Sequence, residues 1–182
     1  FGIAMLGDGN SLDRAWLFAN LLRQFRIDSV ILRCGDQPRS WLFGVLLDEE
    51  VYLFDTNLGL PIPVDRNQPE GVAIDRPATL KQVEQDSTLL SGLAGDAKRP
   101  YPVTAKSLVA AKIEIVGSTS FWAPRMRHLQ MSLAGKESIV LSDPLESSEL
   151  VPEGVLARLK LAGFDSERIT VWSYPERRLE GN

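Results

Sequence analysis

The feature that most constrains this chain is the segment of residues 10–25, NSLDRAWLFANLLRQF. Apolar side chains recur in it at the spacing of an α-helix. One side of that helix carries Leu12, Ala15, Trp16, Ala19 and Leu22, and a second side carries Leu17, Phe18, Leu21 and Phe25. A helix that is apolar almost all round is buried inside a protein. The segment therefore predicts a central buried helix.

Composition narrows the class of protein. The chain has 182 residues, 44% of them hydrophobic and 24% charged, as in ordinary globular proteins. A net charge of −4 with mixed signs argues against a nucleic-acid partner. No apolar run approaches the ~18 residues that a membrane span needs. The chain begins at Phe1 and not at Met, so we expect a piece of a longer protein, and the compartment stays open.

Two residue types are rare enough to limit the chemistry. Cys34 is the single cysteine, so the chain has no internal disulfide. His128 is the single histidine, and most acid–base or metal sites near neutral pH use more than one. We therefore expect no metal and no cofactor.

After the helix, short apolar runs rich in β-branched residues predict strands at 29–34, 40–47 and 51–55. The run at 40–47 has no polar interruption, so we expect both of its faces to be covered. The acidic turn 48–50 would join the last two strands in a hairpin. Residues 56–63, with Gly and Pro, predict a turn without regular structure.

Residues 64–77 predict a loop, and residues 78–93 predict a helix with Thr79 as its cap. Residues 95–104 are polar, contain two prolines and predict a boundary between residues 1–95 and residues 100–182. In the second part helix and strand patterns alternate, which predicts a small α/β subdomain. Its expected elements are a strand at 107–116 (or a short helix there), a helix at 119–133, a strand at 138–142, a helix at 144–162 ended by Gly163, and a strand at 168–174.

Over residues 9–60 the chain resembles the transglutaminase-like core of the papain-like cysteine protease superfamily. Asp13 and Ala15 stand where that family has the Asp and Ala of its Cys-x-Asp-x-Ala helix start. Residues 21–28, LLRQFRID, resemble the family's LLR-x-x-GIP helix exit, with Arg26 in place of Gly. Asp55-Thr56 stands where the family has Asp-Pro. The resemblance implies an α+β fold in which a central buried helix packs on an antiparallel sheet.

The same resemblance exposes two missing reactive groups. Ser11 stands at the position of the family's Cys and Ser40 at that of its His, and of the three only Asp55 remains. The family mechanism needs a thiolate nucleophile, an imidazole that takes its proton and a carboxylate that orients the imidazole. A serine hydroxyl is not ionised by a helix N-terminus alone, and Ser40 has no basic nitrogen. The three residues therefore predict a vestigial site.

The function expected on this basis is a catalytically degenerate transglutaminase-like domain. It would act as a binding or scaffolding module within a longer bacterial protein. Its partner would be a protein or peptide ligand, or neighbouring domains of the same chain. The alternative is an acyl hydrolase or peptidase-type enzyme that uses Ser11 or Cys34 as nucleophile.

Each candidate residue also has a structural interpretation. Ser11 is a favoured helix N-cap, and Asp55 can hold the following turn through its own backbone hydrogen bonds. Cys34 at the end of an apolar strand is typical of a small buried side chain. His128 is expected on the surface, and Trp41, Trp122 and Trp172 in the core, with a ligand groove as the alternative.

Two short patterns give weak indications of ligand sites. Residues 7–9, Gly-Asp-Gly before a helix, are similar to a phosphate cradle but lack the rest of that motif. The acidic turn 48–50 lacks the ligand spacing of a calcium loop, so a solvated hairpin tip is expected there.

Overall fold

Six strands form one mixed sheet in the computed structural model, which describes residues 9–65, 76–91, 93, 100–117 and 155–180. The fold class is α+β, as predicted. The described helices are α2 (Ser11–Gln24), α3 (Leu80–Gln85), α4 (Thr88–Ser91), α5 (Ala105–Val109), α7 (Val155–Leu161), the short 3₁₀ helix η1 (Ser166–Arg168) and α8 (Tyr174–Glu180). The strands are β1 (Asp28–Arg33), β2 (Trp41–Leu47), β3 (Glu50–Asp55), β4 (Leu60–Pro61), β5 (Lys112–Ile115) and β6 (Ile169–Val171).

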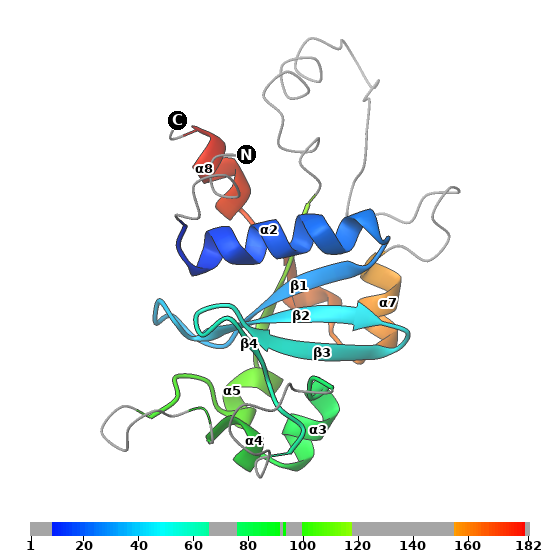
Figure 1. Ribbon diagram of the computed structural model, residues 1–182. Helices are drawn as coiled ribbons and strands as arrows, with labels where there is room; N and C mark the ends of the chain where they lie inside the picture. Colours follow the sequence, from blue (N-terminus) through cyan, green and yellow to red (C-terminus); the bar gives the residue numbers. More distant parts are fainter. Residues whose placement is uncertain (1–8, 66–75, 92, 94–99, 118–154, 181–182) are drawn as a thin grey trace.

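The strand order is β4-β3-β2-β1-β5-β6 (Figure 1). Strands β1 to β4 pair antiparallel, as the predicted hairpin requires. β5 pairs antiparallel with β1, and β6 pairs parallel with β5. Both predicted parts of the chain thus contribute strands to one sheet, and the boundary expected at 95–104 does not divide it.

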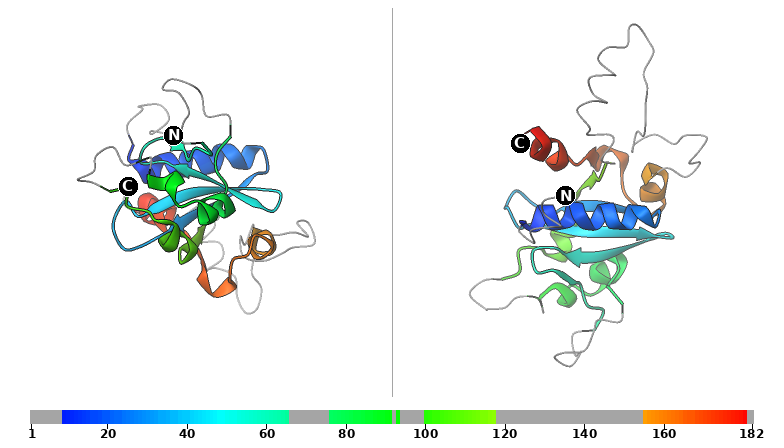
Figure 2. Two further views of the ribbon diagram at one scale, coloured as in Figure 1. Left: turned by 90° about the horizontal axis from the view of Figure 1, so that it is seen from below. Right: turned by 45° about the horizontal axis from the view of Figure 1, so that its top comes forward.

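One face of the sheet is covered by α2 (Figures 1 and 2). Ala15 and Ala19 are the side chains of α2 that are fully buried there, against Ile31 and Phe43 of the sheet. Small alanines let the helix backbone approach the strands closely. Helix α2 therefore packs on the sheet, as the sequence predicted.

The prediction that α2 is buried all round is wrong. Leu17, Leu21 and Phe25 are 38%, 48% and 76% exposed among the described residues. The reason is geometric: a flat sheet contacts only one side of a helix, and these three residues lie four apart on the side that faces away. The apolar residues on both sides of the helix predicted that another part of the protein covers its outer side. No segment in the described part of the chain does so.

The other face of the sheet packs on the smaller helices. Fully buried side chains from the strands meet others from α3, α5 and α7, and the group includes Leu32, Leu42, Leu53, Ile113, Val83, Leu108 and Leu159. An ion pair between Arg158 of α7 and Asp28 links that helix to the start of β1. Strand β2 therefore lies between two apolar layers and is buried on both faces, as its unbroken apolar sequence predicted.

Four expected elements differ in the structure, two of them in the first part of the chain. Residues 56–63 were expected to lack regular structure, but after a turn Leu60 and Pro61 form β4 at the sheet edge, where a proline is tolerated. The helix expected at 78–93 is two short helices, α3 and α4, because the chain leaves helical geometry at Asp86. Its predicted cap, Thr79, is confirmed.

In the second part, residues 107–116 were expected to form a strand or a short helix. The structure has both: the helix α5 comes first and the strand β5 follows it. The strand expected at 168–174 ends at Val171, and Tyr174 begins α8. Gly163 follows α7 with φ +94° and ends it as predicted. The helix at 119–133, the strand at 138–142 and residues 144–154 of the expected helix lie outside the described residues.

No helix in the described part of the chain combines the length and apolar character that crossing a membrane would require.

The residue that follows the C-cap of α2 has a left-handed backbone conformation, which is usually found at glycine. Arg26 has φ +58°. Its N–H donates to the carbonyl of Arg23 at 2.9 Å, and the N–H of Ile27 donates to the carbonyl of Leu22 at 3.1 Å. These two bonds form a Schellman motif, in which a residue with a Cβ is strained.

We therefore predict that Arg26→Gly raises the free energy of unfolding by about 0.5–1 kcal/mol, since it removes the Cβ from the left-handed conformation. Arg26→Ala keeps that Cβ and is the matched control, with no gain expected. Urea denaturation of the three proteins measures the difference. Equal stabilities of the Gly and Ala variants would contradict the strain argument.

Candidate functional site

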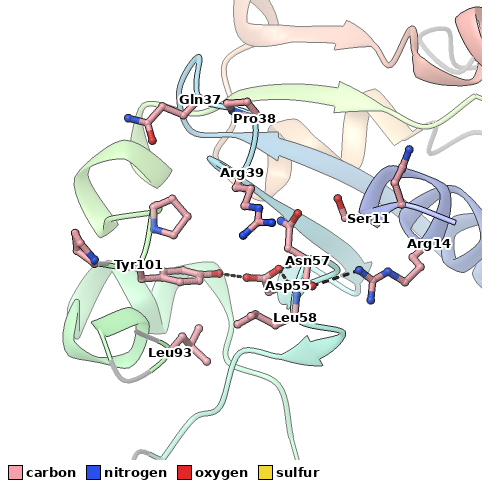
Figure 3. Close-up of a pocket in the computed structure, with 13 residues that line it drawn as sticks. Ser11, Arg14, Gln37, Pro38, Arg39, Asp55, Asn57, Leu58, Leu93 and Tyr101 are labelled. Carbon is pink, nitrogen blue, oxygen red and sulfur yellow. Dashed lines mark hydrogen bonds between the residues drawn. The ribbon is translucent and has the colours of Figure 1, made fainter. Parts of the chain in front are cut away.

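Ser11 and Asp55 line the same pocket, which has a volume of about 850 Å³ (Figure 3). Four parts of the chain form its walls: the start of α2, the loop between β1 and β2, the turn after β3 and the segment before α5. The lining residues are Asn10, Ser11, Arg14, Gln37, Pro38, Arg39, Asp55, Asn57, Leu58, Leu93, Pro100, Tyr101 and Pro102. Two of the three predicted site residues are thus brought together.

Ser11 is the first residue of α2 and not its cap, so the N-cap interpretation is wrong. Asn10 is the cap: its side-chain oxygen accepts from the N–H groups of Leu12 and Asp13, both at 2.9 Å. The Asp13 carboxylate accepts from the N–H of Asn10 at 3.2 Å, which completes a capping box. Asn10 has this role because its backbone is extended, with φ −78° and ψ 179°, whereas Ser11 already belongs to the helix. Ser11 is left half-buried on the pocket wall.

Asp55 is buried, with 3% of its surface exposed. One carboxylate oxygen accepts from the N–H groups of Asn57 at 2.7 Å and Leu58 at 3.1 Å. The other accepts from the Tyr101 hydroxyl at 2.5 Å. The turn-holding role that the sequence allowed for Asp55 is therefore present in the structure. A buried carboxylate needs such donors, because without them its desolvation is costly.

Tyr101 is a site residue that the sequence did not predict. Burial and the hydrogen bond to Asp55 raise the pKa of its phenol well above the ordinary value. The phenol therefore stays protonated and acts as a donor to the carboxylate. It lies between two prolines in the stretch interpreted as a boundary, and no periodic pattern marks it.

Ser40 is not among the residues that line the pocket. It lies just before β2 and is 5% exposed. Its N–H donates to the carbonyl of Gln37 at 3.0 Å and its carbonyl accepts from the N–H of Cys34 at 2.8 Å, so it closes the β1–β2 loop. The structure therefore buries the third predicted site residue at the base of the loop whose tip borders the pocket.

Two arginines give the pocket its positive charge, and sequence reasoning missed both. Arg14, on the first turns of α2, donates to the carbonyl of Asn57 at 3.3 Å. Arg39 extends from the β1–β2 loop toward the turn that holds Asp55 and Asn57 (Figure 3). Both side chains belong to exposed residues. Arg14 interrupts an apolar helix pattern and Arg39 lies in a polar loop, so in the sequence both look like ordinary solvated residues and no signal marked them.

Cys34, the alternative nucleophile, is half-buried, and its thiol donates to the carbonyl of Leu32 at 3.4 Å. Burial raises the pKa of the thiol to about 12, and the nearby Arg33 offsets this only in part. A thiol with that pKa holds almost no thiolate at neutral pH, and the thiolate is the nucleophilic form.

The other candidates carry no chemistry in the described part of the chain. Trp41 and Trp172 are each 1% exposed, which confirms them as core residues. In the acidic turn Glu50 pairs with Lys81 at 2.8 Å. Among the described residues no group of three or more potential metal ligands comes together. Trp122, His128 and residues 7–8 lie outside these residues.

Comparisons with protein-family models, with curated proteins and with solved structures each gave no significant match to this chain.

The Asp55–Tyr101 hydrogen bond generates a stability prediction. Tyr101→Phe should lower the free energy of unfolding by about 1.5–3 kcal/mol, the range for hydrogen bonds to charged groups. A double-mutant cycle with Asp55→Asn measures the coupling of the two side chains by denaturant unfolding. Tyr52→Phe is the matched control, because no hydrogen bond of its hydroxyl occurs among the described residues. Equal losses for Tyr52→Phe and Tyr101→Phe would refute the assigned role.

The raised pKa of Cys34 predicts a pH dependence. In the unfolded chain the thiol loses its proton near pH 9, whereas in the folded protein it keeps the proton up to about pH 12. The unfolded state binds fewer protons in this window, so the free energy of unfolding falls as pH rises, by about 1 kcal/mol between pH 8 and 10. Cys34→Ala should remove this part of the slope. Urea denaturation at pH 8, 9 and 10 under a reductant tests it, and identical slopes for the two proteins would contradict it.

Proposed function

We propose that this chain is a catalytically degenerate transglutaminase-like domain that acts as a binding module within a longer bacterial protein. The observation that carries the proposal is the pocket shared by Ser11 and Asp55, in which the carboxylate is bound by Tyr101. Two positions of the expected triad lie at one pocket, and neither is equipped for acyl transfer.

Three features support the family part of the proposal. A helix, α2, packs on antiparallel strands and begins at the pocket, as the family arrangement requires. Asp55 is the last residue of β3, where the family has its Asp. Arg26 adopts the left-handed conformation at the position where the family's helix exit has glycine. Each agrees with the resemblance read from residues 9–60.

The chemistry of the pocket supports the proposal that the domain is catalytically degenerate. Ser11 needs a base to remove its proton, and no imidazole lines the described pocket. Tyr101 keeps its proton because its pKa is raised, so it is not that base. Asp55 has both oxygens engaged by donors. Serine attack on a carbonyl therefore has no route for the proton.

The pocket also has the properties of a binding site. Its volume of about 850 Å³ is within the range of small-molecule pockets, about 300–1,000 Å³. Guanidinium, amide and hydroxyl groups converge in it beside apolar walls, which is the usual mixture for orienting a ligand. We infer that the pocket serves to bind a ligand and not to catalyse acyl transfer.

The experiment that tests the proposal combines labelling and turnover. The full chain is treated with a fluorophosphonate and with iodoacetamide at pH 8, and modified residues are mapped by mass spectrometry. Because Cys34 holds about a thousandfold less thiolate than a free thiol, its alkylation should be two to three orders of magnitude slower than in the urea-unfolded chain. Ser11 should show no phosphonylation. Hydrolysis and amine transfer on a glutamine peptide should equal those of Ser11→Ala.

Two outcomes of this experiment would show that the protein is an enzyme. Rapid phosphonylation of Ser11, with turnover of an ester or amide that disappears in Ser11→Ala, would replace the proposal by the acyl hydrolase alternative. Rapid alkylation of Cys34, with activity lost in Cys34→Ala, would do the same for a thiol enzyme.

A further inference from the structure

A second pocket adjoins the first. It has a volume of about 300 Å³ and shares Arg14 and Asp55 with the larger one. Its other lining residues are Phe18, Phe54, Thr56, Gly59, Leu60 and Pro61. The walls are therefore mostly apolar, and Arg14 and Asp55 stand at the common border between a polar pocket and an apolar one.

The polar pocket favours an anionic group. Arg14, Arg39 and Asp55 are its charged lining residues within the described part of the chain. The Asp55 carboxylate is hydrogen-bonded by two backbone N–H groups and the Tyr101 hydroxyl, which stabilise its charge without cancelling it, and it stands against two arginines. Arg39 has no carboxylate partner among the described residues, and guanidinium groups bind carboxylates through paired hydrogen bonds. The uncompensated charge of the pocket is positive.

The apolar pocket has rigid walls. Phe18 of α2 contacts Phe54 of β3 edge to face at a centroid distance of 5.3 Å and stacks on Phe43 at 4.9 Å. Leu60, on the edge strand β4, is 51% exposed and borders this pocket. An exposed apolar side chain beside a preformed apolar cavity gains free energy when a ligand covers it.

We propose that the two pockets together bind the C-terminal residue of a peptide chain. The α-carboxylate would lie against Arg39 and Arg14, and an apolar last side chain would enter the pocket of Phe18, Phe54 and Leu60. In that residue the two groups are attached to one carbon, which suits two pockets that share Arg14 and Asp55 as lining residues. The larger pocket leaves room for the preceding residues, and the side-chain amide of Asn57 lines it as a group that can bond their backbone.

This inference rests on the proposed binding function and names its ligand class. Its test uses matched synthetic hexapeptides that end in Leu or Ser, each as free acid and as C-terminal amide. Binding to the full chain is measured by fluorescence polarisation at low salt. The Leu-ended acid should bind best. Its amide and the Ser-ended acid should each bind about tenfold more weakly, since each loses one of the two contacts.

Variants locate the site. Arg39→Gln should weaken the Leu-ended acid about tenfold and leave its amide unchanged, because the charge contact is lost only for the acid. Lys160→Gln removes an equal charge at an exposed position of α7 and is the matched control. Leu60→Ser should weaken the Leu-ended peptide and not the Ser-ended one, whereas Leu161→Ser, at a 63% exposed residue of α7, should change neither. Thermal unfolding confirms that each variant is folded.

The outcomes separate this inference from the proposed function. Equal binding of acid and amide, or equal effects of Arg39→Gln and Lys160→Gln, would overturn the inference and leave a peptide-binding module. Binding of hexanoate as tight as that of the Leu-ended acid would replace the peptide by a small apolar carboxylate. Absence of binding at millimolar peptide would also overturn it. Cleavage of a peptide, in contrast, would overturn the non-catalytic proposal itself.

Discussion

The hydrogen bond between Tyr101 and the buried carboxylate of Asp55 is the interaction on which the pocket depends. It joins two residues 46 apart in the sequence, at the end of β3 and before α5. A carboxylate removed from water is tolerated only when donors surround it. Two backbone N–H groups of the turn and the phenol meet this need. The bond from Tyr101 thus joins two walls of the pocket, the turn that carries Asn57 and the segment that carries Tyr101. It also sets the spacing between them.

A second buried carboxylate repeats this arrangement at the start of α2. Asp13 is 2% exposed and accepts from the Tyr174 hydroxyl at 2.6 Å, 161 residues away in the sequence. Arg178 of α8 also contacts it at 3.3 Å. Asp13 therefore closes the capping box and attaches α8 to the first turn of α2. In both places a carboxylate from the first part of the chain is bound by a tyrosine from the second, so the two parts hold the pocket jointly.

Much of the sheet followed from the sequence, because strands and their covering depend on local apolar patterns. The run of β2 and the cap at Thr79 were predicted, and Gly163 was predicted to end α7. The one-sided burial of α2 was not, since an apolar residue has the same sequence signature whether or not another layer covers it. Tyr101 and Arg39 could not be found either. Their roles arise from contacts between distant segments, and neither lies in a pattern that a period or motif detects.

On the proposed function, the pocket chemistry and the residues at positions 11 and 40 support one account. An aspartate that orients a catalytic imidazole must offer it a free oxygen. Here Tyr101 occupies one oxygen of Asp55 and the turn occupies the other. Both oxygens of Asp55 are thus used in holding the turn and Tyr101, and Ser40 closes a loop instead of lining the pocket. Arg14 and Arg39 line the same pocket as Asp55, and Arg14 donates to the carbonyl of Asn57 in the turn that Asp55 holds. On the proposed function, the carboxylate is free for this structural bond because no imidazole lines the described pocket, and the two arginines make the pocket one that attracts a carboxylate.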